Sequence, residues 1–160
     1  MRELRSINRQ RGMTFVELVI AAIVMAFVLA MAIPSFSQVS ANAALRGTSM
    51  DLVMAVNSAR AESVSLRVPV DLVPLDGADW ASGWRIEFPA PHDAMSSDFA
   101  PRGQVQVAEA AALTAIQFRP NGTASVAAEF TVCDDREGER GRRIRLNRLG
   151  RLENQEITCP

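Results

Sequence analysis

The chain has 160 residues, enough for one membrane-anchored segment and one small domain but not for two large domains. All 17 of its basic residues are arginine, and its formal net charge is -1. The first 12 residues carry four arginines and one glutamate, so the rest of the chain is acidic overall. This balance excludes a domain that seeks nucleic acid through its net charge.

The N-terminal region combines arginines with a long apolar run. Between Arg11 and Arg46 the only charged residue is Glu17, which directly precedes the apolar run Leu18–Ile33. Arginines ahead of such a run predict a segment that enters the membrane, with its N-terminus in the cytoplasm and the remainder exported.

A secretory signal peptide is the alternative interpretation of this region. Ala30-Met31-Ala32 has the small-residue pattern of a signal peptidase site and follows an apolar run of suitable length. Two observations favour the membrane segment instead: Glu17 interrupts the leading edge of the apolar run, and helical periodicity continues beyond Ile33.

One long helix is expected from about Thr14 to Leu66. Pro34 predicts a kink within it, because proline lacks the backbone donor and its ring clashes with the preceding turn. Further on, apolar and small residues recur at spacings of three and four until Pro69 ends the pattern. This stripe consists of Leu45, Ser49, Leu52, Val56, Ala59, Ser63 and Leu66. The first half of the helix is thus compatible with lipid, and the second half is amphipathic.

From Val68 onward the periodicity changes to that of strands separated by turns. The expected strands are Val68–Val73, Trp84–Phe88, Val105–Ala108, Ala115–Phe118, Phe130–Asp134, Arg143–Asn147 and Arg151–Gln155. A helix followed by antiparallel strands predicts an α+β domain in which the amphipathic half of the helix packs against the sheet. Pro89–Gly103 shows little periodicity, so we expect a mobile loop there.

The stretch Arg11-Gly12-Met13-Thr14-Phe15-Val16-Glu17-Leu18, followed by the apolar run and Pro34, resembles the class III leader and first helix of type IV pilins and type II secretion pseudopilins. The resemblance implies that a prepilin peptidase cuts between Gly12 and Met13 on the cytoplasmic side and N-methylates Met13. It divides the chain into a cleaved leader (1–12), a transmembrane and polymerisation half-helix (13–36), an amphipathic half-helix (37–67) and an exported β-rich domain (68–160). Met13 departs from the phenylalanine usual at the first mature position.

Glu17 has a physical rationale independent of this resemblance. Cleavage creates an ammonium group at Met13, and both charges then lie in or near lipid, where an unpaired ion is costly. When helices stack with a small axial stagger, the Glu17 carboxylate of one chain can meet the Met13 amine of its neighbour. Glu17 is therefore the predicted residue for recruitment and register in a filament. The alternative is that its side chain only reaches out to the lipid headgroups.

A second resemblance covers the C-terminal third. The motifs Phe118-Arg119-Pro120-Asn121-Gly122, Phe130-Thr131-Val132-Cys133-Asp134-Asp135-Arg136, Arg143-Ile144-Arg145-Leu146-Asn147 and Gly150-Arg151 resemble the GspH/FimT family of minor pilins and pseudopilins. The resemblance implies a pilin-like α+β fold, other major and minor pilins or pseudopilins as partners, and a single-pass subunit of the bacterial inner membrane with a periplasmic C-terminal domain. Such a subunit is a scarce filament component of a type IV pilus or a type II secretion pseudopilus, expected near the tip, where it helps to initiate or cap the filament.

The two cysteines, Cys133 and Cys159, are expected in the oxidising compartment that this topology implies. A disulfide is favoured over two free thiols. It would limit the unfolded chain and tie the C-terminus to the sheet. Two cysteines with no histidine nearby exclude a tetrahedral zinc site.

Alternation along the predicted strand places Arg143, Arg145 and Asn147 on one face. Exposed arginines can neutralise phosphates, so Arg143, Arg145 and Arg151 are candidate DNA-binding residues for uptake during transformation. Some FimT-type minor pilins bind DNA through a Gly-Arg-x-Arg motif, but the matching stretch here is Gly150-Arg151-Leu152-Glu153, with glutamate as its last residue. The alternative is a solvated surface of ion pairs.

No enzyme motif accompanies these features. His92 is the only histidine, and the chain has neither a nucleophile elbow nor a phosphate-binding glycine loop. Trp80 and Trp84 are expected to pack in the core or anchor a loop rather than bind a ligand. We therefore expect a non-enzymatic protein with no cofactor and no metal.

Overall fold

The structure is a computed structural model that describes residues 13–160. The predicted leader 1–12, with Gly12, lies outside the described residues. The chain divides into two compact units, the first ending at Gln38 and the second spanning Val39–Pro160.

The helix α1 spans Phe15–Leu66, close to the predicted bounds. At its start, the backbone N–H of Glu17 donates to the Thr14 hydroxyl (3.3 Å), so Thr14 caps the helix and Glu17 occupies the third helical position. The helix continues through Pro34 without ending, and the kink expected there stays a prediction. Among the described residues, none of the helices combines the length and apolar character needed to cross a bilayer.

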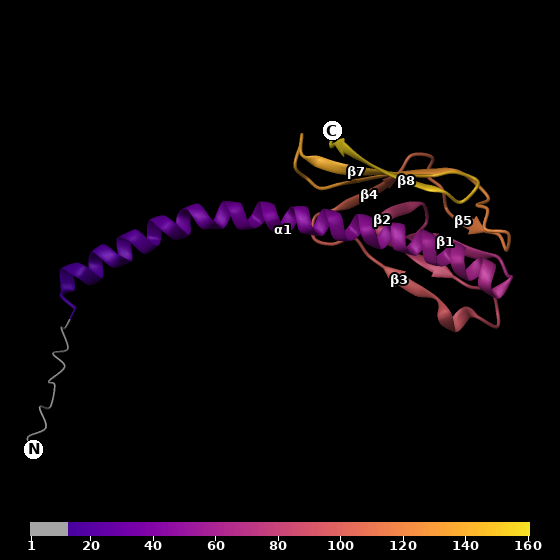
Figure 1. Cartoon of the computed structure of the whole chain (residues 1–160), viewed down its shortest axis with the longest axis horizontal. Helices are drawn as coiled ribbons and strands as arrows, with labels where there is room; N and C mark the ends of the chain where they lie inside the picture. The colour runs from indigo at the N-terminus through magenta and orange to yellow at the C-terminus, as the bar shows by residue number, and fades with distance from the viewer. Residues whose placement is uncertain (1–12) are drawn as a thin grey trace, which may run out of the picture. The chain divides into compact units, whose positions relative to one another are not determined.

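In the described part of the chain, eight strands follow α1 and form two antiparallel sheets in place of the single sheet expected (Figure 1). They are β1 (Val70–Asp76), β2 (Asp79–Glu87), β3 (Ser97–Phe99), β4 (Gln106–Glu109), β5 (Ile116–Phe118), β6 (Ala128–Cys133), β7 (Arg140–Leu146) and β8 (Leu152–Thr158). The first sheet has the order β3-β2-β1-β5 and the second the order β4-β6-β7-β8. The α+β class is confirmed.

The amphipathic stripe of α1 forms one wall of the core. Leu52, Val56 and Ala59 are completely buried, which confirms the predicted face of the helix. Two polar members of the stripe are buried with hydrogen bonds: the Ser49 hydroxyl donates to Leu45 O (2.8 Å), and the Ser63 hydroxyl donates to Arg119 O (3.0 Å). These bonds remove the cost of burying a hydroxyl inside an apolar layer.

The two sheets meet through aromatic side chains in the same core. Trp80 from β2 lies edge-on against Phe130 from β6, with ring centroids 4.8 Å apart, and both side chains are buried. The Trp80 indole N–H donates to Leu113 O (2.8 Å). Trp84 is buried as well, so the prediction that both tryptophans serve packing is confirmed.

The loop expected at Pro89–Gly103 is corrected by the structure. This segment contains a short 3-10 helix, η1 (Asp93–Met95), and the strand β3, which pairs with β2. Asp98 accepts two hydrogen bonds from Arg85 (2.5 and 2.7 Å), and Phe99 stacks on Trp84. A strand of three residues is too short to show periodicity, and its partners lie more than ten residues away in the sequence.

Candidate functional site

The first candidate site is the N-terminal part of α1. Residues 13–29 and 36–38 are all exposed, and they include large apolar side chains such as Phe15, which is 81% exposed. Within this segment Glu17 is the single charged residue, and it lies in the first turn of the helix. A carboxylate at this position interacts favourably with the positive end of the helix dipole. Of the predicted assembly residues, Glu17 therefore lies in the first turn of an exposed, largely apolar stretch of helix, and Met13 is exposed just before the helix begins.

The disulfide between Cys133 and Cys159 is present, which confirms that prediction. It joins the end of β6 to the residue that follows β8, with the two Cα atoms 5.9 Å apart. Gly141 on β7 lies directly beneath it, because a Cβ atom there would stand 2.5 Å from the Cys159 sulfur. Glycine is therefore required where the disulfide crosses β7.

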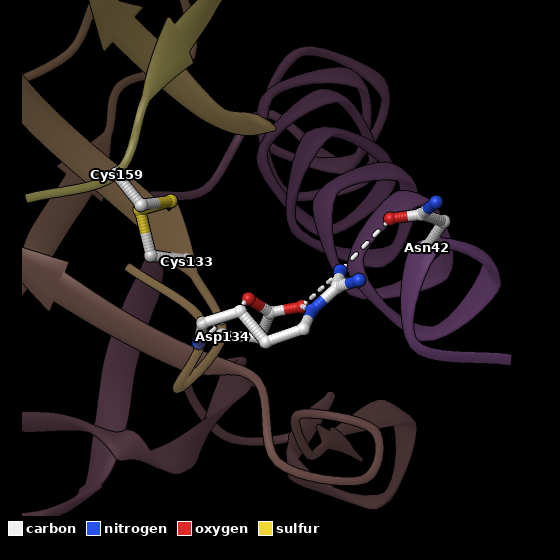
Figure 2. A network of polar contacts seen from close by, with 5 residues as sticks. Asn42, Cys133, Asp134 and Cys159 are labelled. Atoms are coloured by element: carbon white, nitrogen blue, oxygen red, sulfur yellow. Dashed lines mark hydrogen bonds and ion pairs between the residues drawn. A yellow bond between two sulfur atoms is a disulfide. The ribbon is translucent and has the colours of Figure 1, made fainter. Parts of the chain in front are cut away.

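A polar clasp next to the disulfide reaches the helix (Figure 2). Asp134 follows Cys133 and its side chain is almost completely buried, and Arg136 pairs with it at 2.5 Å. A second N–H of the Arg136 side chain donates to the Asn42 amide oxygen on α1 (2.8 Å). The hydrogen bond to Asp134 raises the pKa of Arg136 above its ordinary value. The charge of the buried carboxylate is thus neutralised within the chain.

The predicted arginine face is present on the second sheet. Ile144 and Leu146 are buried while Arg145 and Asn147 are exposed and Arg143 is half-buried, so the predicted alternation along β7 is confirmed. Arg143 and Arg145, however, do not present free positive charges.

Glu129 on β6 lies between them. Its carboxylate accepts a hydrogen bond from Arg145 Nε (2.7 Å), and its other oxygen lies 3.2 Å from Arg143 Nε. The second contact has the distance of an ion pair but not the geometry of a hydrogen bond. The hydrogen bond from Arg145 holds the pKa of Glu129 below its ordinary value. One carboxylate therefore compensates two of the three candidate DNA-binding residues.

Arg151 lies at the rim of a groove of about 780 Å³ across the end of the second sheet. Its side chain is exposed and pairs with no carboxylate among residues 13–160. The groove is also lined by Arg145 and by three carboxylates, those of Glu109, Glu129 and Glu153. Acidic groups outnumber basic ones there, which opposes phosphate binding.

One contact between the helix and two turns leaves no signal in the sequence. The Arg60 side chain on α1 donates from Nε to Gly122 O (2.9 Å). At Gly150, where φ is +76°, a Cβ atom would stand 2.4 Å from Gly122 O and 2.8 Å from Arg60 Nε. The glycine of the Gly150-Arg151 motif thus allows two turns to approach the helix. Both glycines belong to motifs named in the sequence, but nothing there indicated Arg60 as their partner.

Comparisons with known proteins agree with this architecture. The family model described as type II transport protein GspH matches residues 48–150, and the model described as the prokaryotic N-terminal methylation motif matches residues 7–33. No curated protein matches the chain.

Two solved structures share the fold, and both are crystal structures of the type IV minor pilin FimU of Pseudomonas aeruginosa strain PAO1. One has a TM-score of 0.60 and the other 0.56, each with 24% sequence identity over 69% of this chain. The match covers 87% of the first FimU chain and 92% of the second. At this identity the likeness concerns the fold alone.

Proposed function

Because the chain belongs to the family of type II transport protein GspH, whose members are minor pilins and pseudopilins, we propose that it helps to initiate or cap a filament without catalysing a reaction. One observation carries this proposal. A helical segment of apolar residues, with a single carboxylate in its first turn, is exposed along its whole described length. Such a surface is stable only against lipid or against other helices.

The proposed route begins with processing. Prepilin peptidase cuts between Gly12 and Met13 and methylates Met13, and residues 13–36 hold the subunit in the inner membrane until it is assembled. Residues 37–67 then carry the periplasmic domain 68–160. The filament is a type IV pilus or a type II secretion pseudopilus, and the partners are its other major and minor subunits.

Glu17 has two distinct roles in this proposal. Within one chain it sits in the first helical turn, where its backbone is capped by Thr14 and its charge complements the helix dipole. Between chains its carboxylate pairs with the amine of a neighbour's Met13, which sets register in the filament. An unpaired carboxylate costs about 2.5 to 3.5 kcal/mol at the centre of a membrane helix and less near the interface.

The test separates these two roles. Glu17→Gln keeps the side-chain length and removes the charge, whereas Thr14→Ala removes the cap and keeps the charge. We expect the amount of Glu17→Gln protein in sheared filaments to be at least about tenfold lower than that of wild type, since a loss of about 1.4 kcal/mol in pairing free energy already corresponds to tenfold. For Thr14→Ala the amount of protein in filaments should stay within about threefold of wild type, because a helix cap contributes about 1 kcal/mol to helix stability. Equal incorporation of Glu17→Gln and wild type would refute the pairing role.

The mass and N-terminal sequence of the mature chain from membranes test the processing step. A methylated Met13 at the N-terminus supports the proposal. An N-terminus at Ile33 would instead identify a signal peptide and a released periplasmic domain, and would refute the membrane-held subunit.

A further inference from the structure

The second sheet ends in an unusually long edge strand. Each sheet has two edge strands, and three of the four are short: β3 and β5 have three residues and β4 has four. The fourth, β8, has seven residues and is the last strand of the chain in Figure 1. It pairs with β7 on one side, and its other side faces no strand among residues 13–160.

This edge lacks most of the features that normally protect a sheet from pairing with another chain. Natural proteins protect edges with prolines, bulges, charged side chains or very short strands, and of these β8 has only the charges of Glu153 and Glu156. The register of β8 with β7 runs without interruption from Leu152, opposite Leu146, to Thr158, opposite Arg140. The sequence Leu-Glu-Asn-Gln-Glu-Ile-Thr has no proline and no arginine. Five of its seven residues are exposed and none is buried.

The backbone bonds at both ends of β8 determine which residues face outward. After β8, the Cys159 N–H donates to Glu139 O (2.8 Å), and before β8, Arg151 O accepts from the Asn147 N–H (3.1 Å). Residues 151 and 159 therefore bond toward β7, and so do the odd-numbered residues between them, because bonding alternates in an antiparallel pair. The even-numbered residues Leu152, Asn154, Glu156 and Thr158 direct their N–H and C=O groups to the free side.

Both ends of β8 are held in place. Cys159 is fixed by the disulfide to Cys133 on β6. At the other end, the Asn147 side-chain oxygen accepts hydrogen bonds from the N–H groups of Leu149 and Arg151, both 3.0 Å long. A strand that is already ordered loses little entropy when another strand pairs with it.

We propose that the free edge of β8 accepts an extended, basic segment of another filament subunit, which adds a strand to the second sheet. That the partner belongs to the filament depends on the proposed function. The outward N–H and C=O groups require a strand-like partner, since they match the spacing of another backbone.

The charge of β8 specifies the chemistry of this partner. Glu153 and Glu156 are its two charged residues, and they lie on opposite faces of the sheet. Glu156 already forms ion pairs with Arg140 and Arg142 of β7, at 3.5 and 3.7 Å, and about half of its side chain is exposed. Glu153 is exposed and lies opposite Arg145, which is hydrogen-bonded to Glu129. A second copy of β8 would bring two further carboxylates to the interface, whereas a strand with arginine or lysine on the face of Glu153 neutralises that carboxylate.

The experiment uses the full chain in the cells that make the filament. A photo-crosslinking amino acid replaces Gln155, and two variants are compared in this background. Asn154→Pro removes an outward N–H and places a proline ring on the free side, where the bonds to β7 are untouched. Asn154→Ala removes the same side chain and keeps the N–H, so it is the matched control. Equal urea midpoints for the two variants in detergent establish that both are folded.

We expect an adduct with another subunit of the filament, crosslinked within an extended segment that contains arginine or lysine. Its yield should fall about tenfold in Asn154→Pro and stay unchanged in Asn154→Ala. The double variant Glu153→Arg with Glu156→Arg keeps every backbone donor and should lower the yield in the same way by charge repulsion. This second variant also tests the proposal should Asn154→Pro fail to fold.

The proposal is overturned by the absence of an adduct, by an adduct with a second copy of the chain or with a protein outside the filament, or by a yield that both Asn154→Pro and the charge reversal leave unchanged. The amount of wild-type protein in filaments from the same cells distinguishes failure of the strand addition from failure of the proposed function. Wild-type protein that is present in filaments without an adduct at β8 refutes only the strand addition, whereas protein that is absent from filaments refutes the proposed function.

Discussion

Residues 13–38 and residues 39–160 differ in whether their apolar side chains are exposed or buried. In the first region the described side chains are exposed, including those of Phe15, Leu18 and Phe27. In the second, the helix face around Leu52 and Val56 is buried against two sheets. The difference shows that one chain contains a part that completes its own core and a part whose apolar surface requires other molecules.

This comparison also separates two uses of one helix. The second half of α1 contributes free energy to the folded state of the single chain, because its apolar stripe leaves water on folding. The first half gains almost nothing from folding of the single chain and becomes stable through its surroundings. Substitutions in the two halves should therefore differ in what they change, stability in one case and assembly in the other.

The largest effect is expected for a leucine pair that tests this contrast directly. Leu52→Ala empties a fully buried site and should lower the free energy of unfolding by about 4 kcal/mol. Leu18→Ala, at a position that is 56% exposed, should change it by less than about 0.5 kcal/mol. Urea unfolding of the full chain in detergent measures both. Similar losses for the two leucines would contradict the division.

The disulfide should give the second largest effect, confined to residues 39–160. Replacing both Cys133 and Cys159 by serine removes a crosslink between residues 26 positions apart and should cost about 3 kcal/mol. A reducing agent added to the wild type should give the same loss, whereas added to the double variant it should change nothing. An unchanged urea midpoint in the double variant would show that the crosslink does not stabilise the domain.

A glycine pair sharpens the comparison within the second region. Gly150→Ala introduces strain at positive φ and a clash with Gly122 O. It should lower the free energy of unfolding by about 2 to 3 kcal/mol. Gly77→Ala has positive φ but no atom within 4 Å of the new Cβ, and should cost about 1 kcal/mol. Thermal unfolding of both variants measures the difference. If both lose the same amount, the approach of Arg60 to the two turns contributes nothing.

A smaller effect is expected from pH, again only in the second region. The hydrogen bond from Arg145 lowers the pKa of Glu129 in the folded state below its ordinary value of 4.5. The ionised carboxylate therefore stabilises the fold at pH values above about 4.5. That contribution is lost as the pH falls from about 4.5 through the lower folded value. Urea midpoints between about pH 6 and pH 3 should therefore fall less steeply in Glu129→Gln than in wild type. Equal slopes would show that the pair is too solvated to matter.

The smallest effect is expected for duplex DNA. Because Glu129 compensates Arg143 and Arg145, wild-type protein should show no measurable binding at about 150 mM salt. Glu129→Gln releases both arginines and should gain weak binding at low salt. Wild-type binding that weakens steeply with salt and falls on replacing Arg143, Arg145 or Arg151 would instead support the DNA-uptake alternative.

The residues recovered from the sequence are those whose environment is local. The stripe that contains Leu52 and Val56 follows helical spacing, and the alternation of Ile144 and Arg145 follows strand spacing, so both were predicted correctly. The strand β3 was missed because it has three residues and is held by Arg85 and Trp84 from a distant strand. The Arg60 contact was missed for a similar reason, since its acceptor Gly122 lies 62 residues further along the chain.

The amino-acid sequence by itself determined the long helix, the α+β class, the single carboxylate in an apolar stretch and the pair of cysteines available for a disulfide. Each of these depends on spacing or composition along one segment, which local backbone geometry converts directly into a face or a period. Only the tertiary structure decided that Glu129 neutralises two arginines, that Gly150 lies against Arg60, and that β8 is left as a free edge. Those outcomes depend on strand order and register, which bring together residues that no local pattern connects.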